Sequence, residues 1–225
     1  IVVLLISICL SVFTVYASEI PSVWVRNYSV QEYEASCQNW DITICSRANL
    51  YVANNSGLLT FDGNTWRTHL VPDDQVITEV SCYKDTVYTR GPTVQGYWAS
   101  NTSGLLEFHP IHDWPLESSS SMYANEAEVP QEIQKYRPSA FASLGNYKLI
   151  GTETNGVYIL NENGEILVHL SLQNQLQDNI VRAICIQDDR QFWVALDNGL
   201  SQVCLDPPLV LLGERSVFGK LQAAR

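Results

Sequence analysis

Four stretches of the chain repeat one pattern: an apolar run, a polar turn, a glycine and a second apolar run. The glycines are Gly57, Gly96, Gly156 and Gly199, which lie 39, 60 and 43 residues apart. Ser-Gly and Asn-Gly turns supply the positive φ that tight hairpins need. A period of about 40–45 residues with four short strands is typical of a β-propeller blade, whose faces are buried only when blades stack. The pattern therefore predicts an all-β chain of four-stranded antiparallel blades.

A second glycine sets the register of the strands within three of the repeats. Gly63, Gly104 and Gly164 lie 6, 8 and 8 residues after the first glycine of their repeats. In a rival register, Gly104 would align with Gly57, because both are preceded by Ser and followed by two Leu. The matching offsets favour Gly104 between the third and fourth strands of its blade, and Gly57, Gly96 and Gly156 in tight turns. We expect blades at about residues 37–72, 76–110, 138–171 and 180–213, an insertion at 111–137 and the start of a fifth blade at 216–225.

Propellers usually close with about four to eight blades. Four blades and a stub therefore predict an incomplete propeller, an open arc whose blade-four side is exposed. The fourth strand of that last blade is expected at Leu209–Leu212, and a helical turn is expected after Pro130 in the insertion.

The first 18 residues carry no charge and resemble the apolar core of a secretory signal, with Val15-Tyr16-Ala17 as a cleavage site. The alternative is a membrane anchor, but a spanning helix needs about 20 apolar residues. No initiator Met or basic segment precedes the run, so we expect a signal peptide (1–18) truncated at its start. The remaining domain, 19–225, is then periplasmic or extracellular.

The charge balance restricts the partners of the chain. It has 24 acidic and 13 basic residues and a net charge of −11, without a long block of one sign. An acidic surface repels phosphate backbones, so no direct contact with nucleic acid is expected.

Six cysteines occur, of which Cys9 leaves with the signal. The odd remainder and the lack of a Cys-x-x-Cys motif argue against a disulfide framework and a zinc site, although one pair remains open in an oxidising compartment. Cys45, Cys82 and Cys185 fall at matching positions of the first strands and are interpreted as small buried packing residues.

Residues for catalysis are not brought together by this pattern. His69, His109 and His169 fall on the outer strands of three different blades, too far apart to share a metal. The chain has no Gly-x-Ser-x-Gly, His-Glu-x-x-His, P-loop or Gly-x-Gly-x-x-Gly motif. Acidic pairs such as Asp73-Asp74 and Asp188-Asp189 lie in expected turns. The sequence therefore predicts neither catalysis nor a cofactor.

Binding is the more plausible role. The turns between second and third strands share one face of a propeller with the connections between blades, and amides and carboxylates there, ringed by aromatic side chains, suit a polar small ligand such as an oligosaccharide. The alternative is that Asn and Asp are simply what hairpin turns prefer. The insertion at 112–137 would lie beside this face. The candidate residues are Asn54, Asn55, Arg90, Glu153, Thr154, Asp197 and Asn198.

Two regions resemble a known family. Residues Gln38–Ile42 and Tyr51–Gly63, and in the fourth repeat Val181–Leu200, resemble the two-component-regulator-type propeller of bacterial triple-tyrosine, LuxR-type or hybrid two-component regulators. In such proteins a periplasmic propeller is followed by an immunoglobulin-like domain, a membrane helix and a kinase or helix-turn-helix module. The resemblance implies a ligand-sensing, non-catalytic module of a membrane-spanning transcriptional regulator that could dimerise at full length. A secreted carbohydrate-binding protein or polysaccharide-active enzyme, and a scaffold for protein partners, are the alternatives.

Overall fold

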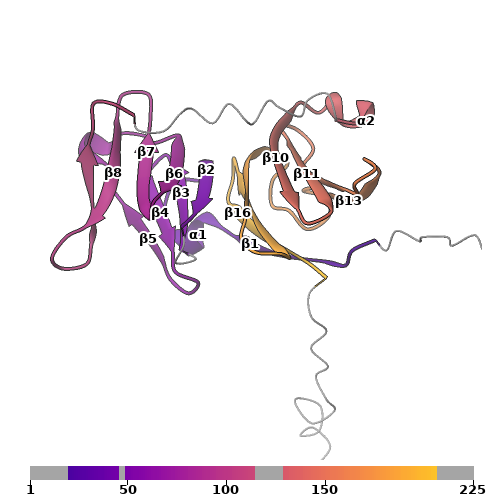
Figure 1. Cartoon of the computed structure of the whole chain (residues 1–225), viewed down its shortest axis with the longest axis horizontal. Helices are drawn as coiled ribbons and strands as arrows, with labels where there is room; N and C mark the ends of the chain where they lie inside the picture. Colours follow the sequence, from indigo (N-terminus) through magenta and orange to yellow (C-terminus); the bar gives the residue numbers. More distant parts are fainter. Residues whose placement is uncertain (1–19, 46–48, 115–128, 207–225) are drawn as a thin grey trace, which may run out of the picture.

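The computed structural model describes residues 20–45, 49–114 and 129–206. These residues form sixteen strands in four separate four-stranded antiparallel sheets, with only two four-residue helices and one 3-10 turn (Figure 1). The predicted signal peptide and the predicted start of a fifth blade lie outside the described residues. The all-β open arc of four-stranded blades is confirmed. No helix in the described part is long and apolar enough to cross a membrane.

Three blades follow the chain in order, from inner to outer strand. The bounds of their strands are as follows. Blade 1 consists of β2 (Asn39–Ile44), β3 (Leu50–Asn54), β4 (Gly57–Phe61) and β5 (Trp66–His69). Blade 2 consists of β6 (Glu79–Tyr83), β7 (Thr86–Arg90), β8 (Gln95–Ser100) and β9 (Leu106–Pro110). Blade 3 consists of β10 (Pro138–Leu144), β11 (Tyr147–Thr152), β12 (Val157–Leu160) and β13 (Ile166–Leu170). A 3-10 turn, Pro72–Asp74, lies between blades 1 and 2.

Blade 4 is built from both ends of the described chain. Its first three strands are β14 (Val181–Ile186), β15 (Gln191–Leu196) and β16 (Leu200–Leu205). Its outer strand is β1 (Val23–Tyr28), which pairs antiparallel with β16 from Val23↔Leu205 to Tyr28↔Leu200. The expectation that Leu209–Leu212 fills this place is wrong for the described sheet, because β1 occupies the edge of β16; residues 209–212 themselves lie outside the described part. Helix α1 (Val30–Tyr33) then leads from β1 into blade 1.

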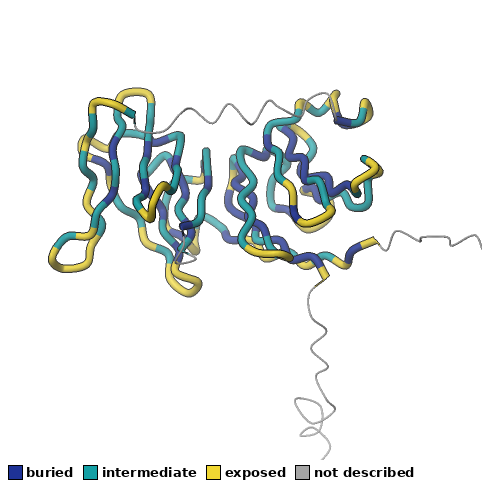
Figure 2. The backbone as a smooth tube through the Cα atoms, in the orientation of Figure 1, coloured by how far each residue is buried: buried dark blue, intermediate teal, exposed yellow. Residues whose placement is uncertain are grey.

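Because the N-terminal strand belongs to blade 4, the order of the blades in space differs from their order along the chain. Three hydrophobic clusters bury the contacts of blade 2 with blade 1, of blade 1 with blade 4, and of blade 4 with blade 3 (Figure 2). In the same order, the clusters include Val80 and Trp98, Tyr28 and Trp193, and Phe192. The arc therefore runs 2-1-4-3 and is open between blades 2 and 3. The expected exposed side at blade four is wrong, because β1 joins that blade to blade 1.

The turn glycines confirm most of the predicted register. Gly57, Gly104 and Gly156 have positive φ, and Gly104 lies between β8 and β9 as expected. Gly96 is different: it lies within β8, paired with Thr89, and the turn is made by residues 91–94. A Cβ at Gly96 would lie 2.4 Å from the Phe108 ring. Gly96 is thus needed for close packing inside the blade rather than for a turn.

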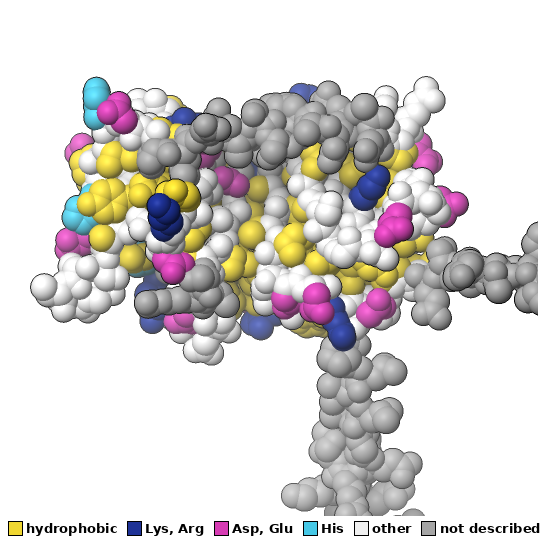
Figure 3. Space-filling model, viewed as in Figure 1, with side chains coloured by type: hydrophobic (Ala, Val, Ile, Leu, Met, Phe, Trp, Pro, Cys, Tyr) yellow, Lys and Arg dark blue, Asp and Glu magenta, His cyan; other side chains and the backbone are white. Residues whose placement is uncertain are grey.

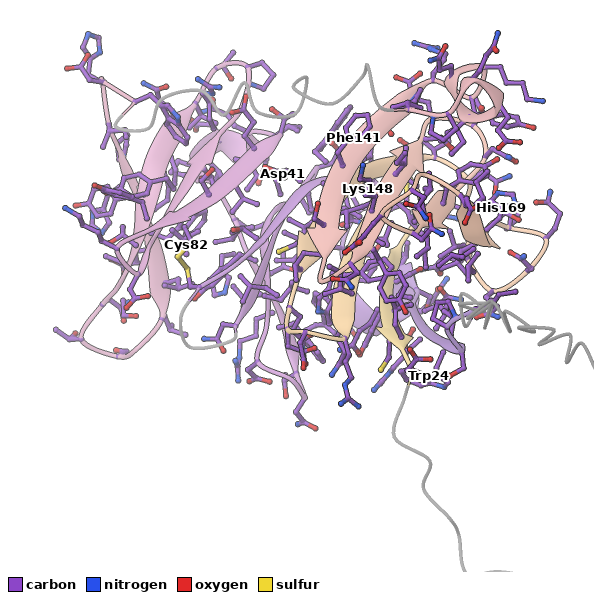
Figure 4. All side chains as sticks on the ribbon, turned by 45° about the vertical axis from the view of Figure 1, so that its right-hand side comes forward. Trp24, Asp41, Cys82, Phe141, Lys148 and His169 are labelled. Carbon is purple, nitrogen blue, oxygen red and sulfur yellow. A yellow bond between two sulfur atoms is a disulfide. The ribbon has the colours of Figure 1, made fainter. Side chains whose placement is uncertain are left out.

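A disulfide joins blades 1 and 2. Cys45, directly after β2, is bonded to Cys82 of β6, with the two Cα atoms 5.6 Å apart (Figure 4). The interpretation of these two residues as simple packing residues is therefore wrong. Of the remaining described cysteines, Cys185 is a partly buried thiol, and burial together with the nearby charge of Asp41 raises its pKa to about 11.

The insertion between blades 2 and 3 contains the expected helical turn, α2 (Gln131–Gln134). Ile133 of α2 is fully buried against the outward face of blade 3, in a cluster with Ile150 and Leu160. Trp114, at the other end of the insertion, lies against Tyr88 of blade 2. The described ends of the insertion therefore cover parts of the two blade faces that border the opening.

Candidate ligand-binding site

The direction of the strands determines which turns lie together on the predicted binding face. Within each antiparallel sheet, the turn between the second and third strands lies at the same end as the connection to the next blade. The candidate residues lie in or beside these turns. The order 2-1-4-3 nevertheless separates them: Arg90 is on blade 2 and Glu153 on blade 3, at opposite ends of the arc.

Asn54 is not accessible to a ligand. Its side chain is fully buried, and its Nδ2 donates to the Ser36 carbonyl at 2.7 Å and to Asn39 Oδ1 at 2.9 Å. Asn39 Nδ2 in turn donates to the Gly199 carbonyl at 2.9 Å. This pair of amides ties blade 1 to the turn between β15 and β16, so Asn54 has a structural role.

Two other candidates, Asn55 and Asp197, are connected through Gln38 at the junction of blades 1 and 4. Asp197 Oδ1 accepts hydrogen bonds from Gln38 Nε2 at 2.7 Å and from Arg182 Nη2 at 2.6 Å. Asn55 Nδ2 donates to Gln38 Oε1 at 3.2 Å, and Trp40 Nε1 donates to Asn55 Oδ1 at 2.7 Å. The Arg182 guanidinium lies over the Trp40 ring, 5.0 Å from its centroid. We call these five residues the blade 1–4 cluster.

The blade 1–4 cluster is within reach of solvent. The side chains of Arg182 and Asp197 are 29% and 32% exposed. Gln38, Trp40 and Asn55 are also only partly buried, and the neighbouring Asn198 is exposed. The cluster therefore presents a carboxylate, a guanidinium, two amides and an indole, all of which are held in place by one another.

Gln38, Trp40 and Arg182 were missed by the reasoning from sequence. Trp40 and Arg182 occupy the same position in their blades, the second residue of the inner strand, where the ladder shifts register by one residue. Such a bulge re-aims a side chain. Aligning Asn39-Trp40-Asp41-Ile42 with Val181-Arg182-Ala183-Ile184 would have placed the two residues in one column.

The remaining candidates form separate ion pairs. Arg90 Nη2 lies 2.6 Å from Glu79 Oε2, and its guanidinium is 5.0 Å from the Trp114 ring centroid. Glu153 Oε2 lies 2.8 Å from Arg137 Nη2, and Thr154 Oγ1 donates to the Tyr136 carbonyl. These pairs resemble Arg182–Asp197 in chemistry but belong to the two end blades, so the full predicted set does not form one site.

A cleft of about 700 Å³ lies between blades 1 and 2, beside Cys45. Its lining includes His69, whose Nε2 is 3.0 Å from Thr60 Oγ1, and Trp98. Burial lowers the pKa of His69, assisted by the nearby charge of Arg67, which favours the neutral form of the ring. His109 and His169 lie on the outer strands of other blades, as expected. Among the described residues, no group of three His, Cys, Asp or Glu side chains could hold a metal ion.

Asp41 of β2 carries a carboxylate into the packed junction of blades 1 and 2 (Figure 4). Its Oδ2 accepts from the Val80 backbone N–H at 2.9 Å and its Oδ1 from the Ile42 N–H at 2.8 Å. Desolvation by burial nevertheless raises the pKa of Asp41 from 3.8 to about 6, and the charge of Glu79 adds to the rise.

We expect the free energy of unfolding to fall as pH rises from about 4 to 6, because the folded carboxyl keeps a proton there that the unfolded one has lost. The slope due to Asp41 is at most about 1.4 kcal/mol per pH unit. Urea denaturation of the wild type and of Asp41→Asn across this range measures it. His69 acts in the opposite sense, since its lowered pKa removes stability as pH falls, but it is present in both proteins. Parallel curves for the two proteins would show that Asp41 does not titrate in this window.

Comparison with known proteins adds a structural likeness but no family. No family model and no curated protein matches the chain. Solved structures similar to it include the extracellular domain of a hybrid two-component system of B. thetaiotaomicron (16% identity, TM-score 0.33, covering 84% of this chain and 24% of that one). A second such domain from the same organism has 14% identity and a TM-score of 0.30, covering 79% and 22%.

Virginiamycin B lyase from Staphylococcus aureus is also similar, at 10% identity and a TM-score of 0.32, covering 78% of this chain and 54% of the lyase. The chain spans about a quarter of the length of the two extracellular domains and about half that of the lyase. At TM-scores of 0.33 and below, these likenesses identify neither a ligand nor an activity.

Proposed function

We propose that the chain is a periplasmic ligand-binding propeller module, part of a membrane-spanning sensor, which binds a small polar ligand without transforming it. The observation that carries the proposal is the blade 1–4 cluster. A carboxylate and two amides beside an indole suit a ligand with several hydroxyl groups, because each polar group can exchange an internal bond for one to the ligand.

The position of the cluster suits a sensor. Asp197 and Arg182 belong to blade 4, whereas Gln38, Trp40 and Asn55 belong to blade 1. A ligand held by both blades binds best when the junction is closed, so binding would bias the geometry of the arc. In this proposal the change is passed to the output module that the sequence resemblance implies.

Two features support an exported module. The sequence begins with an apolar run typical of a secretory signal. The Cys45–Cys82 disulfide suits an oxidising compartment, since cytosolic thiols are generally kept reduced. An oligosaccharide of two or three residues is the ligand class that we favour.

We expect a ligand from a panel of mono- to trisaccharides and amino acids to bind the full chain, as measured by titration calorimetry. Asp197→Asn and Arg182→Gln should each raise the dissociation constant roughly 10- to 100-fold, the usual effect of losing a charged hydrogen-bonding partner. Glu153→Gln, which alters the equivalent ion pair on blade 3, is the matched control and should bind as the wild type does.

Thermal denaturation of each variant confirms that it is folded at the temperature of the titration. Equal loss of affinity in Glu153→Gln, or full affinity in both cluster variants, would contradict the assignment of the site. Release of degradation products from any panel sugar, followed by chromatography, would replace the sensor proposal with the enzyme alternative.

A further inference from the structure

Blade 2 borders the opening of the arc, and within the described part of the chain one of its faces has no neighbouring blade. Its other face packs on blade 1 through Val80, Val87 and Trp98. Because side chains alternate along a strand, the intervening residues form the free face. None of these is buried. They are Glu79, Ser81, Tyr83, Thr86, Tyr88, Arg90, Gln95, Tyr97, Ala99, Glu107 and His109.

A line of aromatic rings crosses this free face. Tyr88, Tyr97 and His109 are directly opposite one another on β7, β8 and β9. The ring centroids of Tyr88 and Tyr97 are 6.2 Å apart, those of Tyr97 and His109 are 5.0 Å apart and stacked, and Trp114 lies 6.2 Å from Tyr88 at the other end. We call these four residues the blade 2 aromatic stripe. Figure 3 shows hydrophobic side chains gathered over blade 2, at the left of the view, with a histidine beside them.

The free face is not composed like a surface that packs another blade. The contacts between blades are rich in Val, Leu and Ile. The outward face of blade 3 likewise carries Phe141, Ile150 and Leu160, and α2 covers it. The strand residues of the free face of blade 2 include no Val, Leu, Ile or Phe, although Ile111 follows β9 directly at its edge. Every member of the stripe combines a flat ring with a polar atom. This composition suits a surface that stays wet and binds a hydrated partner.

The charged residues of the free face favour a neutral partner over a polyanion. Arg90 is the only Lys or Arg in the four strands of blade 2, and it is paired with Glu79. Lys84, in the turn between β6 and β7, lies over the Tyr83 ring, with its Nζ 5.1 Å from the ring centroid. A polyanion would therefore meet a carboxylate at the only guanidinium, and repulsion from a chain of net charge −11. A neutral polymer is repelled neither by this carboxylate nor by the net negative charge.

We propose that the blade 2 aromatic stripe is a platform for a neutral polysaccharide chain. Tyr97 and His109 stack on each other, and Trp114 meets Tyr88 edge to face, so a sugar chain would lie along the ring edges and the ring surface that these contacts leave uncovered. The C–H groups of successive sugar rings would pack there, which removes apolar surface from water. The hydroxyl groups of the sugars would bond to the tyrosine hydroxyls and to the Arg90–Glu79 pair at the rim. The platform is separate from the blade 1–4 cluster and goes beyond the function proposed above.

Affinity electrophoresis of the full chain through gels containing galactomannan, arabinoxylan or hydroxyethylcellulose tests the platform, with polygalacturonate as the charged comparison. At least one neutral polymer should retard the protein, and soluble hexasaccharides should compete better than disaccharides. Tyr88→Ala and Tyr97→Ala should each weaken binding roughly tenfold or more, as truncation of a central aromatic contact usually does. Tyr97→Phe, which keeps the ring, should retain most of the affinity.

Trp24→Ala is the matched control, because Trp24 is an exposed aromatic residue on another blade, and it should have no effect. Asp197→Asn should also have no effect on binding to the polymers. The platform can therefore be tested independently of ligand binding at the blade 1–4 cluster. The platform is excluded if none of the neutral polymers retards the protein, if polygalacturonate binds best, or if both alanine variants bind normally. A dimer in sedimentation experiments that Tyr88→Ala dissociates would also overturn it, since the face would then be a protein interface.

Discussion

Deletion of residues 20–28 should abolish the cooperative unfolding transition of the whole arc. The deletion removes β1, and with it the outer strand of blade 4 and the buried Tyr28. Tyr28 packs against Phe61, Trp66 and Trp193 at the junction of blades 1 and 4. Loss of a buried aromatic side chain alone costs about 3–5 kcal/mol, which is comparable with the whole stability of many domains. Thermal unfolding followed by circular dichroism measures the effect.

Two substitutions in β1 separate the role of the core from that of the strand edge. Tyr28→Ala should lower the free energy of unfolding by about 3–5 kcal/mol. Trp24→Ala should change it by less than about 0.5 kcal/mol, because Trp24 is 51% exposed at the outer edge of blade 4 (Figure 4). A deletion variant that unfolds at the wild-type temperature would mean that another segment, such as the originally expected Leu209–Leu212, can take the place of β1.

Removal of the disulfide by Cys45→Ser should destabilise the chain by about 3–4 kcal/mol, because the bond closes a loop with a sequence separation of 37 residues in the unfolded state. Urea denaturation of oxidised wild type and of the variant gives the difference. The single substitution also leaves Cys82 as a free thiol, which thiol titration detects.

Cys37→Ser provides the matched control, since Cys37 is an exposed free thiol and its replacement should leave the stability within about 0.5 kcal/mol. A reducing agent should lower the stability of the wild type to that of Cys45→Ser and leave the variant unchanged. Equal stability of oxidised and reduced wild type would show that the bond contributes nothing to the folded arc.

The sequence was most informative where structure is local. Alternating apolar residues and positive-φ glycines such as Gly57 and Gly156 predicted the hairpins, because a hairpin depends on a few adjacent residues. Gly96 was misplaced because a glycine that admits a neighbouring ring, here Phe108, has the same sequence signal as one that makes a turn. The outer strand of blade 4 was misassigned because β1 lies far from β16 in the chain and belongs to no repeat.

The candidate site was predicted in part, for a related reason. Asn55 and Asp197 were identified from turn chemistry, and both are hydrogen-bonded to Gln38 at the junction of blades 1 and 4. Arg90 and Glu153 are separated because β1 places blade 4 beside blade 1, and the opening falls between blades 2 and 3. Trp40 and Arg182 were missed because the bulge that aims them is a property of strand pairing.

The disulfide was not predicted because it, too, joins residues that are far apart in the sequence. Cys45 and Cys82 were recognised as equivalent positions in neighbouring blades, but repeat spacing does not show how far apart two equivalent positions lie. In the structure the two Cα atoms are 5.6 Å apart, within the range that a disulfide spans.

The account depends on blade 4 lying beside blade 1, since only then does the blade 1–4 cluster exist. A cysteine placed in β1 tests this most directly, because Trp24 is directly opposite the native Cys204 of β16. We predict that Trp24→Cys forms a disulfide with Cys204 under mild oxidation, identified by mass spectrometry of proteolytic peptides. Arg26→Cys, which lies opposite Gln202, should not form one. If Trp24→Cys couples to Cys204 no more than Arg26→Cys does, β1 does not complete blade 4 and the proposed site is not assembled.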